Sequence, residues 1–145
     1  MPIIVNSQPQ LGKTTEYRLS IQADLNGFSF SIVNDKMHKP LFVYASDFTM
    51  DRDDMSLFAK KCSELIKSTP ILGSKFRRVE IIYGTEKYSL LPTRLHIKGE
   101  ELKELSALHR LDELDEINIA DVTREDMKIL FAVNSTFMNV IKEYQ

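Results

Sequence analysis

The sequence has little cysteine, no tryptophan and no long apolar run, and these absences remove several classes of protein. One cysteine, Cys62, cannot form an intramolecular disulfide, which argues against a disulfide-stabilised secreted domain. No apolar run approaches the ~18 residues that a membrane-spanning helix needs. The opening MPIIVNSQPQ has neither the basic segment nor the long apolar segment of a secretory signal. These absences predict a cytoplasmic protein without a membrane partner.

An excess of one charge is also missing. The formal net charge is −2 and the basic residues are scattered, so no nucleic-acid partner is predicted. Arg77 and Arg78 are adjacent, but neighbouring side chains on a strand point to opposite faces, so the pair predicts no basic patch. The three histidines have no second His or Cys at metal-ligand spacing, and no Gly-x-Ser-x-Gly motif occurs. No metal site and no catalytic residue is predicted.

The 145 residues suffice for one domain with its own core. Residues 1–16 carry two prolines, a glycine and many polar residues, which predicts a loosely ordered arm before a single lobe over 17–145. Within the arm, Gly12-Lys13-Thr14 resembles the end of a phosphate-binding P-loop. Ser7 stands where that motif needs glycine, and a strand pattern follows where it needs a helix, so the match fails twice.

The stretch 17–48 predicts an antiparallel meander of three strands. Residues 17–24 and 28–33 alternate apolar and polar side chains, and Asn26-Gly27 between them is a strong hairpin signal. The third run, Leu41–Ala45, is almost continuously apolar, which is typical of a strand covered on both faces.

Further strands and helices alternate along the rest of the chain. Cys62 lies on an apolar stripe at helical spacing, which predicts a buried small side chain rather than a nucleophile. Asn134-Ser135-Thr136 offers an N-cap to the last helix. The order βββ-α-ββ-α-ββ-α predicts one mixed sheet with helices packed on its faces, an α/β or α+β domain. Helices are expected over 55–66, 100–111 and 137–144, and Thr69-Pro70 ends the first of them. Strands are expected over 76–83, 87–91, 117–122 and 127–133. The first two of these strands are expected to form a hairpin around 84–86.

Three segments carry a resemblance to a known family. NGFSFSI (26–32), EKYSLLPTRL (86–95) and MKILFAVNSTFMNVI (127–141) are similar to an uncharacterised bacterial family whose members are roughly twice this length and are described as having an actin-like ATPase fold. The opening meander with Asp24-x-x-Gly27 resembles one lobe of that fold, in which two ribonuclease H-like lobes enclose a nucleotide cleft. The resemblance implies that this chain is the first, N-terminal half of such a protein.

The resemblance also implies a nucleotide site, at Asp24, Asn26 and Gly27, that would take ATP and magnesium with the help of a partner lobe. Nucleotide-binding members of the superfamily carry Asp-x-Gly at this hairpin, so that backbone amides approach the phosphates. Here the loop is one residue longer and the bulky Phe28 follows it. One lobe forms no cleft, and we expect no ATP hydrolysis by this chain alone.

Three hypotheses follow. The favoured one is a non-enzymatic scaffold or protein-interaction module, a degenerate actin-like lobe without cofactor that docks against a second actin-like lobe or forms a homodimer through exposed apolar surface. The second is nucleotide binding at the Asp24–Gly27 hairpin. The third is a metal-dependent nuclease, which needs converging carboxylates. Its candidates are Asp24, Asp47, Glu64 and Glu80, and none of them has diagnostic spacing.

Overall fold

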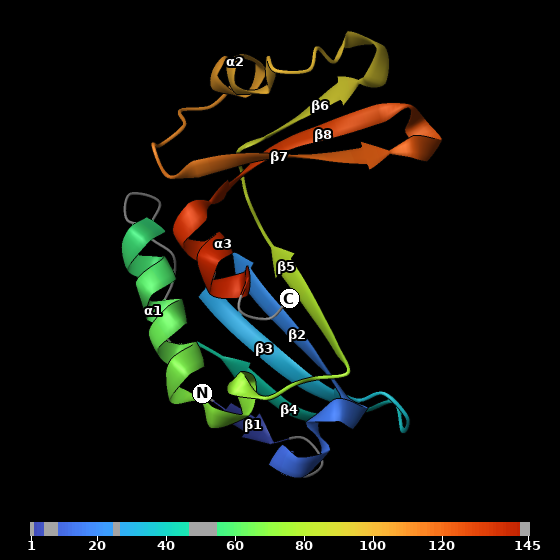
Figure 1. Cartoon of the computed structure of the whole chain (residues 1–145), viewed down its shortest axis with the longest axis vertical. Coiled ribbons are helices and arrows are strands. Elements are labelled where there is room, and N and C mark those ends of the chain that lie inside the picture. Colours follow the sequence, from blue (N-terminus) through green and yellow to red (C-terminus); the bar gives the residue numbers. More distant parts are fainter. Residues whose placement is uncertain (1, 5–8, 25–26, 47–54, 143–145) are drawn as a thin grey trace. The chain divides into compact units, whose positions relative to one another are not determined.

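The computed structural model describes residues 2–4, 9–24, 27–46 and 55–142 (Figure 1). The contacts divide the chain into two compact units, Met1–Gly84 with Val140–Gln145, and Thr85–Asn139. The sequence predicts a single sheet, whereas the structure has a five-stranded mixed sheet and a separate three-stranded antiparallel sheet. The mixed α and β composition is as predicted.

The five-stranded sheet contains the predicted meander. Its strand order is β1-β4-β3-β2-β5, and all neighbours are antiparallel except β2 and β5, which run parallel. The N-terminal arm holds more regular structure than the sequence predicts, because β1 pairs with β4 and a 3-10 helix, η1, leads into β2. The strands are β1 (Pro2–Ile4), β2 (Tyr17–Asp24), β3 (Gly27–Asn34), β4 (Lys39–Ala45) and β5 (Arg78–Tyr83), and η1 is Leu11–Glu16.

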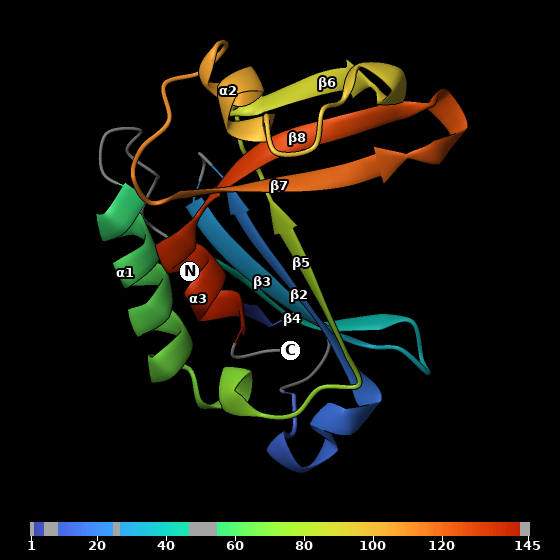
Figure 2. The same cartoon turned by 45° about the horizontal axis from the view of Figure 1, so that its top comes forward.

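Strand β2 shows why the alternating pattern forms this sheet. Its apolar residues, Tyr17, Leu19, Ile21 and Ala23, are buried on one face, while the polar residues between them face the other side. Helix α1 (Met55–Ser68) flanks the sheet in both views (Figures 1 and 2). It buries Phe58, Cys62 and Ile66 at helical spacing and ends before Pro70, as predicted.

Strand β4 corrects one prediction. Leu41 is buried, but Phe42, Val43 and Tyr44 are only half-buried, so the strand is not covered on both faces. Its aromatic residues instead stack on Phe30 of the neighbouring strand, with ring centroids 5.7 Å away for Phe42 and 5.2 Å for Tyr44. The apolar run therefore reflects aromatic stacking on one side of the sheet.

The second unit contains the three-stranded sheet, with the order β6-β8-β7. The predicted hairpin around 84–86 is wrong, because β5 pairs with β2 and β6 pairs with β8. Turn residues between two strands show that the chain changes direction, but they do not show which strand becomes the neighbour. The elements are β6 (Tyr88–Pro92), η3 (Thr93–Leu95), α2 (Glu101–Ser106), β7 (Asp115–Val122), η4 (Thr123–Glu125) and β8 (Met127–Asn134).

Two helices complete the chain. Helix α2 is shorter than the predicted 100–111 because only Leu105 of its leucine stripe is buried, while Leu102 and Leu108 are exposed. Helix α3 (Ser135–Lys142) has the predicted N-cap, since the backbone N–H of Thr136 donates to Oδ1 of Asn134 at 2.9 Å.

Candidate functional site

Asp24 lies at the carboxyl end of β2, where its Cα is in register with that of Gly27. The side chain is half-buried, and its Oδ2 accepts a hydrogen bond of 2.6 Å from Nε2 of Gln22 on the same face of the strand. Gly27 has φ 128°, a conformation that favours glycine. Asn26, the third residue of the nucleotide hypothesis, lies outside the described residues. Asp24 and Gly27 thus lie opposite each other across the hairpin.

Gly84 lies beside Asp24 at the same end of the sheet, and sequence analysis missed it. It follows β5 directly, and its backbone N–H donates to the carbonyl oxygen of Ala23 at 2.9 Å. A Cβ added at Gly84 would lie 2.7 Å from the Cβ of Asp24, closer than real Cβ atoms approach. Because β2 and β5 are parallel, their carboxyl ends meet here, and ligands of open α/β sheets bind outside such ends. A resemblance to a glycine-rich phosphate loop could not have found Gly84, since it lies 60 residues from Asp24 in the chain.

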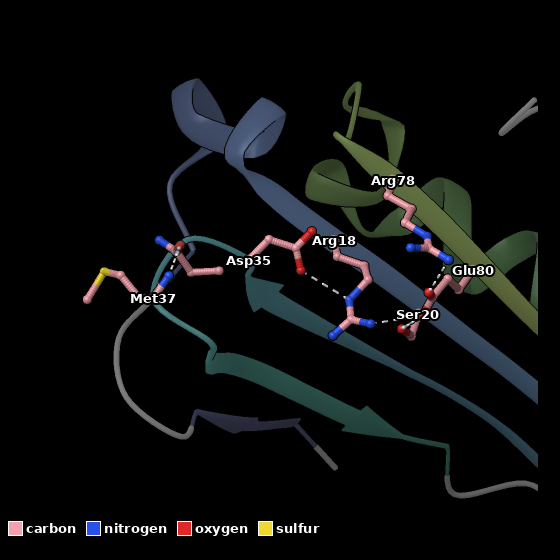
Figure 3. A network of polar contacts seen from close by, with 7 residues as sticks. Arg18, Ser20, Asp35, Met37, Arg78 and Glu80 are labelled. Carbon is pink, nitrogen blue, oxygen red and sulfur yellow. Dashed lines mark hydrogen bonds and ion pairs between the residues drawn. The ribbon is translucent and has the colours of Figure 1, made fainter.

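A charged network occupies the polar face of the same sheet (Figure 3). Arg18 of β2 lies between two carboxylates, with Nε 3.3 Å from Oδ1 of Asp35 and Nη1 3.2 Å from Oε2 of Glu80. Nη2 of Arg78 is 3.0 Å from Oε1 of Glu80, and the hydroxyl of Ser20 donates to Oε2 of Glu80. Each of these carboxylates is therefore neutralised by arginine, which suits a structural network better than a metal site.

The nuclease hypothesis gains no support from the carboxylate positions. Glu80 belongs to the arginine network, Glu64 is exposed on α1, and Asp47 lies outside the described residues. Among the described residues, no group of three or more His, Cys, Asp or Glu side chains could hold a metal ion. The structure therefore does not bring together the described candidates, Asp24, Glu64 and Glu80.

Two further polar clusters lie in the second unit. Nζ of Lys87 is 2.7 Å from Oδ2 of Asp112 and 2.6 Å from Oδ2 of Asp115. Burial opposes the charge of Lys87, but the hydrogen bonds to the two carboxylates outweigh it and raise the lysine pKa. The hydrogen bond from Lys87 in turn lowers the pKa of Asp112. This cluster joins the start of β6 to the start of β7 and has a structural role.

His96 and Glu101 form the second cluster, with Nε2 2.9 Å from Oε1. The other carboxylate oxygen of Glu101 accepts from the backbone N–H of Gly99 at 2.8 Å. A hydrogen bond from the backbone N–H of Glu101 to its own carboxylate, together with the contact with His96, holds the pKa of this carboxyl below its usual value. The pair fixes the entry to α2.

Cys62 is fully buried on α1, as predicted. Burial raises the pKa of its thiol to about 12. A thiol that stays protonated and inaccessible does not act as a nucleophile, so the role of Cys62 is to pack in the hydrophobic core.

Apolar side chains are exposed in the second unit. On edge strand β6, Tyr88 is 51% and Leu90 57% exposed. They share one face of the sheet with their cross-strand partners on β8, Phe131 and Ile129, which are half-buried. We call these four residues the apolar ladder. Other exposed apolar residues of this unit are Leu95, Ile97, Leu102, Leu108, Leu114 and Ile119.

Comparison with known proteins agrees with the predicted fold. A family model described as "Protein of unknown function (DUF3822)" matches residues 6–145. The structure is similar to that of a protein from Bacteroides thetaiotaomicron VPI-5482, described as having an actin-like ATPase fold and unknown function. The TM-score is 0.72 at 18% sequence identity, and the match covers 95% of this chain and 52% of that chain. No curated protein matches the sequence.

These matches confirm the predicted resemblance for the fold. The chain spans about half the length of its structural relative, as one lobe of the actin-like ATPase fold does. Among the described residues, no helix is both long and apolar enough to cross a bilayer.

Proposed function

The chain belongs to this family of unknown function, DUF3822, and we propose that it is a non-enzymatic interaction module whose actin-like lobe docks against a second lobe of the same fold. The apolar ladder carries the proposal. Tyr88 and Leu90 are each more than half exposed on an edge strand, and their partners on β8 continue the apolar surface across the sheet. Contiguous exposed apolar surface of this kind favours a protein partner.

The length of the structural relative suggests what kind of partner this lobe would have. That chain is about twice as long as the part that this chain matches, so it has as much chain again beyond the matched half. A second copy of this chain carries the same fold and the same apolar ladder, so the assembly we propose for this chain is a homodimer formed through the apolar ladder.

Self-association tests the proposal directly. We expect the average mass in sedimentation equilibrium to rise with concentration from 16.7 kDa toward twice that value. Leu90→Glu should remain monomeric, because it replaces the burial of a leucine, about 1.5–3 kcal/mol, with a buried charge. The matched control is Ile119→Glu. Ile119 is also exposed, but it pairs with Leu130 and so lies on the opposite face of the sheet.

The control variant should associate as the wild type does. A wild-type chain that stays monomeric at the highest concentration would exclude the homodimer. Equal dissociation of both glutamate variants would place the contact elsewhere than on the apolar ladder.

One observation favours a second candidate function, nucleotide binding at Asp24. Gly84, which has no side chain, packs against Asp24 at the carboxyl ends of the parallel strands β2 and β5, and ligands of open α/β sheets bind outside such ends. In this hypothesis the ligand is ATP with magnesium, and a partner lobe completes the cleft.

Thermal unfolding with and without millimolar Mg-ATP tests this candidate. Ligand at ~100 times its dissociation constant stabilises a protein by about 2.7 kcal/mol, which raises Tm by several degrees. Asp24→Ala should lose the shift, whereas Glu113→Ala, a change of the same charge at an exposed residue of the second unit, should keep it. An unchanged Tm in the wild type, or a shift that survives in Asp24→Ala, would count against the site.

A further inference from the structure

A basic groove lies where α1 ends and β5 begins. Its volume is about 930 Å³, and residues between Ile66 and Val79 line it. Among the described residues that line it, four are basic and exposed and none is acidic, although the whole chain has a net charge of −2. The basic residues of the groove are Lys67, Lys75, Arg77 and Arg78.

The groove brings together two arginines that sequence analysis separates. Alternation along a strand assigns Arg77 and Arg78 to opposite faces, but β5 begins only at Arg78. Arg77 precedes the strand, and both residues line the groove. The prediction that this pair contributes to no basic patch is therefore wrong.

The wall of the groove is a fixed turn. Thr69 ends α1 by donating from its hydroxyl to the carbonyl oxygen of Leu65 at 2.7 Å, and a 3-10 helix, η2 (Pro70–Gly73), follows. Leu72 is fully buried beneath the turn, and the backbone N–H of Arg77 donates to the carbonyl oxygen of Tyr17 at 3.0 Å. The basic residues are thus mounted on a backbone that is already ordered, which lowers the entropic cost of binding.

Within the described part of the chain, three of the four basic residues of the groove have no acidic partner. Arg78 pairs with Glu80, but Lys67, Lys75 and Arg77 make no ion pair with any residue in the described part of the chain. The carboxyl end of a helix carries partial negative charge, and this alone favours a cation such as Lys67 there. That reason does not extend to Lys75 and Arg77, which follow the helix by several residues.

From this geometry we infer that the basic groove binds a small polyanion carrying two or more phosphate or carboxylate groups. Guanidinium and ammonium groups in one concavity provide charge-assisted hydrogen bonds to such groups, and the volume is in the range of small-molecule sites, about 300–1,000 Å³. The groove lies at the amino end of β5, opposite to the end that Gly84 follows. It is therefore a separate site from the Asp24 edge, and it does not depend on the proposed docking function.

Isothermal titration calorimetry at a constant ionic strength of about 0.15 M tests the inference, because salt at this level screens exposed charges over about 8 Å. The probes are inorganic tripolyphosphate and citrate, which distinguish phosphate from carboxylate as the preferred group. We expect saturable binding of at least one probe, weakened by at least about tenfold in the double variant Lys75→Ala/Arg77→Ala, because the variant removes two of the four side chains that can donate charge-assisted hydrogen bonds to the probe. Both side chains are exposed, so the variant should melt as the wild type does.

The matched control is Lys98→Ala/Arg124→Ala, which removes the same charge from exposed residues of the second unit. This control should bind as tightly as the wild type. Absence of saturable binding for both probes, or equal weakening in the two double variants, would overturn the inference, because the attraction would then be absent or spread over the whole surface.

Discussion

Replacing Gly84 by alanine tests the close approach of the ends of β2 and β5. The added Cβ would lie 2.7 Å from the Cβ of Asp24 and 3.5 Å from its Cα. Both atoms are fixed by the backbone of β2, so no side-chain rotation can relieve the clash. The backbone φ of Gly84 lies outside the left-handed region, so the effect is steric rather than conformational.

The expected loss follows from the cost of overpacking a fixed site, about 1–3 kcal/mol of unfolding free energy. In a domain of this size, each kcal/mol changes Tm by about 4 °C. Gly84→Ala should therefore melt about 4–12 °C below the wild type. Separation of the ends of β2 and β5 should also weaken the hydrogen bond from the Gly84 N–H to Ala23, which amide hydrogen exchange reports.

Gly73→Ala is the matched control, because no described residue apart from its near neighbours in the chain comes within 4 Å of a Cβ built at Gly73. Its Tm should stay within about 2 °C of the wild type, as is usual for surface substitutions of ±0.5 kcal/mol. Equal stability of the two alanine variants would refute the close approach, and the structural support for a ligand at Asp24 would go with it.

Three further predictions concern two buried side chains and one ion pair. Cys62, with its pKa near 12, should not react with a thiol reagent in the native protein and should react at once in denaturing urea; rapid native labelling would contradict its burial. Phe137→Ala should cost about 3–5 kcal/mol in urea unfolding, because the side chain is fully buried; a loss below 1 kcal/mol would show that the site is loosely packed. Lys87→Met should have a lower free energy of unfolding than the wild type, mainly above pH 4. Its partner Asp112 has a lowered pKa, so the stabilisation is complete above the ordinary value of 3.8 and is lost as pH falls through the folded value. A difference from the wild type that does not shrink between pH 7 and pH 3 would argue against this coupling.

Local patterns predicted the elements well where burial follows the pattern. The alternation over 17–24 matches the buried and exposed sides of β2, and the stripe that includes Cys62 became the buried side of α1. The shorter α2 shows the limit of this reasoning, because a leucine stripe extends a helix only where the rest of the chain packs against it.

Pairing between distant strands could not be predicted. Gly84 to Glu86 looks like a hairpin turn, yet β5 pairs in parallel with β2, some 60 residues earlier. Turn residues are local, whereas the choice of neighbour depends on tertiary packing. The candidate site depends on the same pairing, since Asp24 meets Gly84 only because these strands are neighbours. The sequence alone therefore placed Asp24 at a strand end but missed its partner.

Strand β5 has one further consequence, because it forms an edge of the five-stranded sheet with β2 as its only neighbour among the described strands. Edge strands offer unpaired backbone groups to other chains, and charged side chains discourage such contacts. Arg78 and Glu80 protect the first half of β5, but the second half ends in Ile82, which is exposed, and Tyr83. Misassembly during expression or heating should therefore begin at the carboxyl end of this edge, and a lysine in place of Ile82 should suppress aggregation without altering the core.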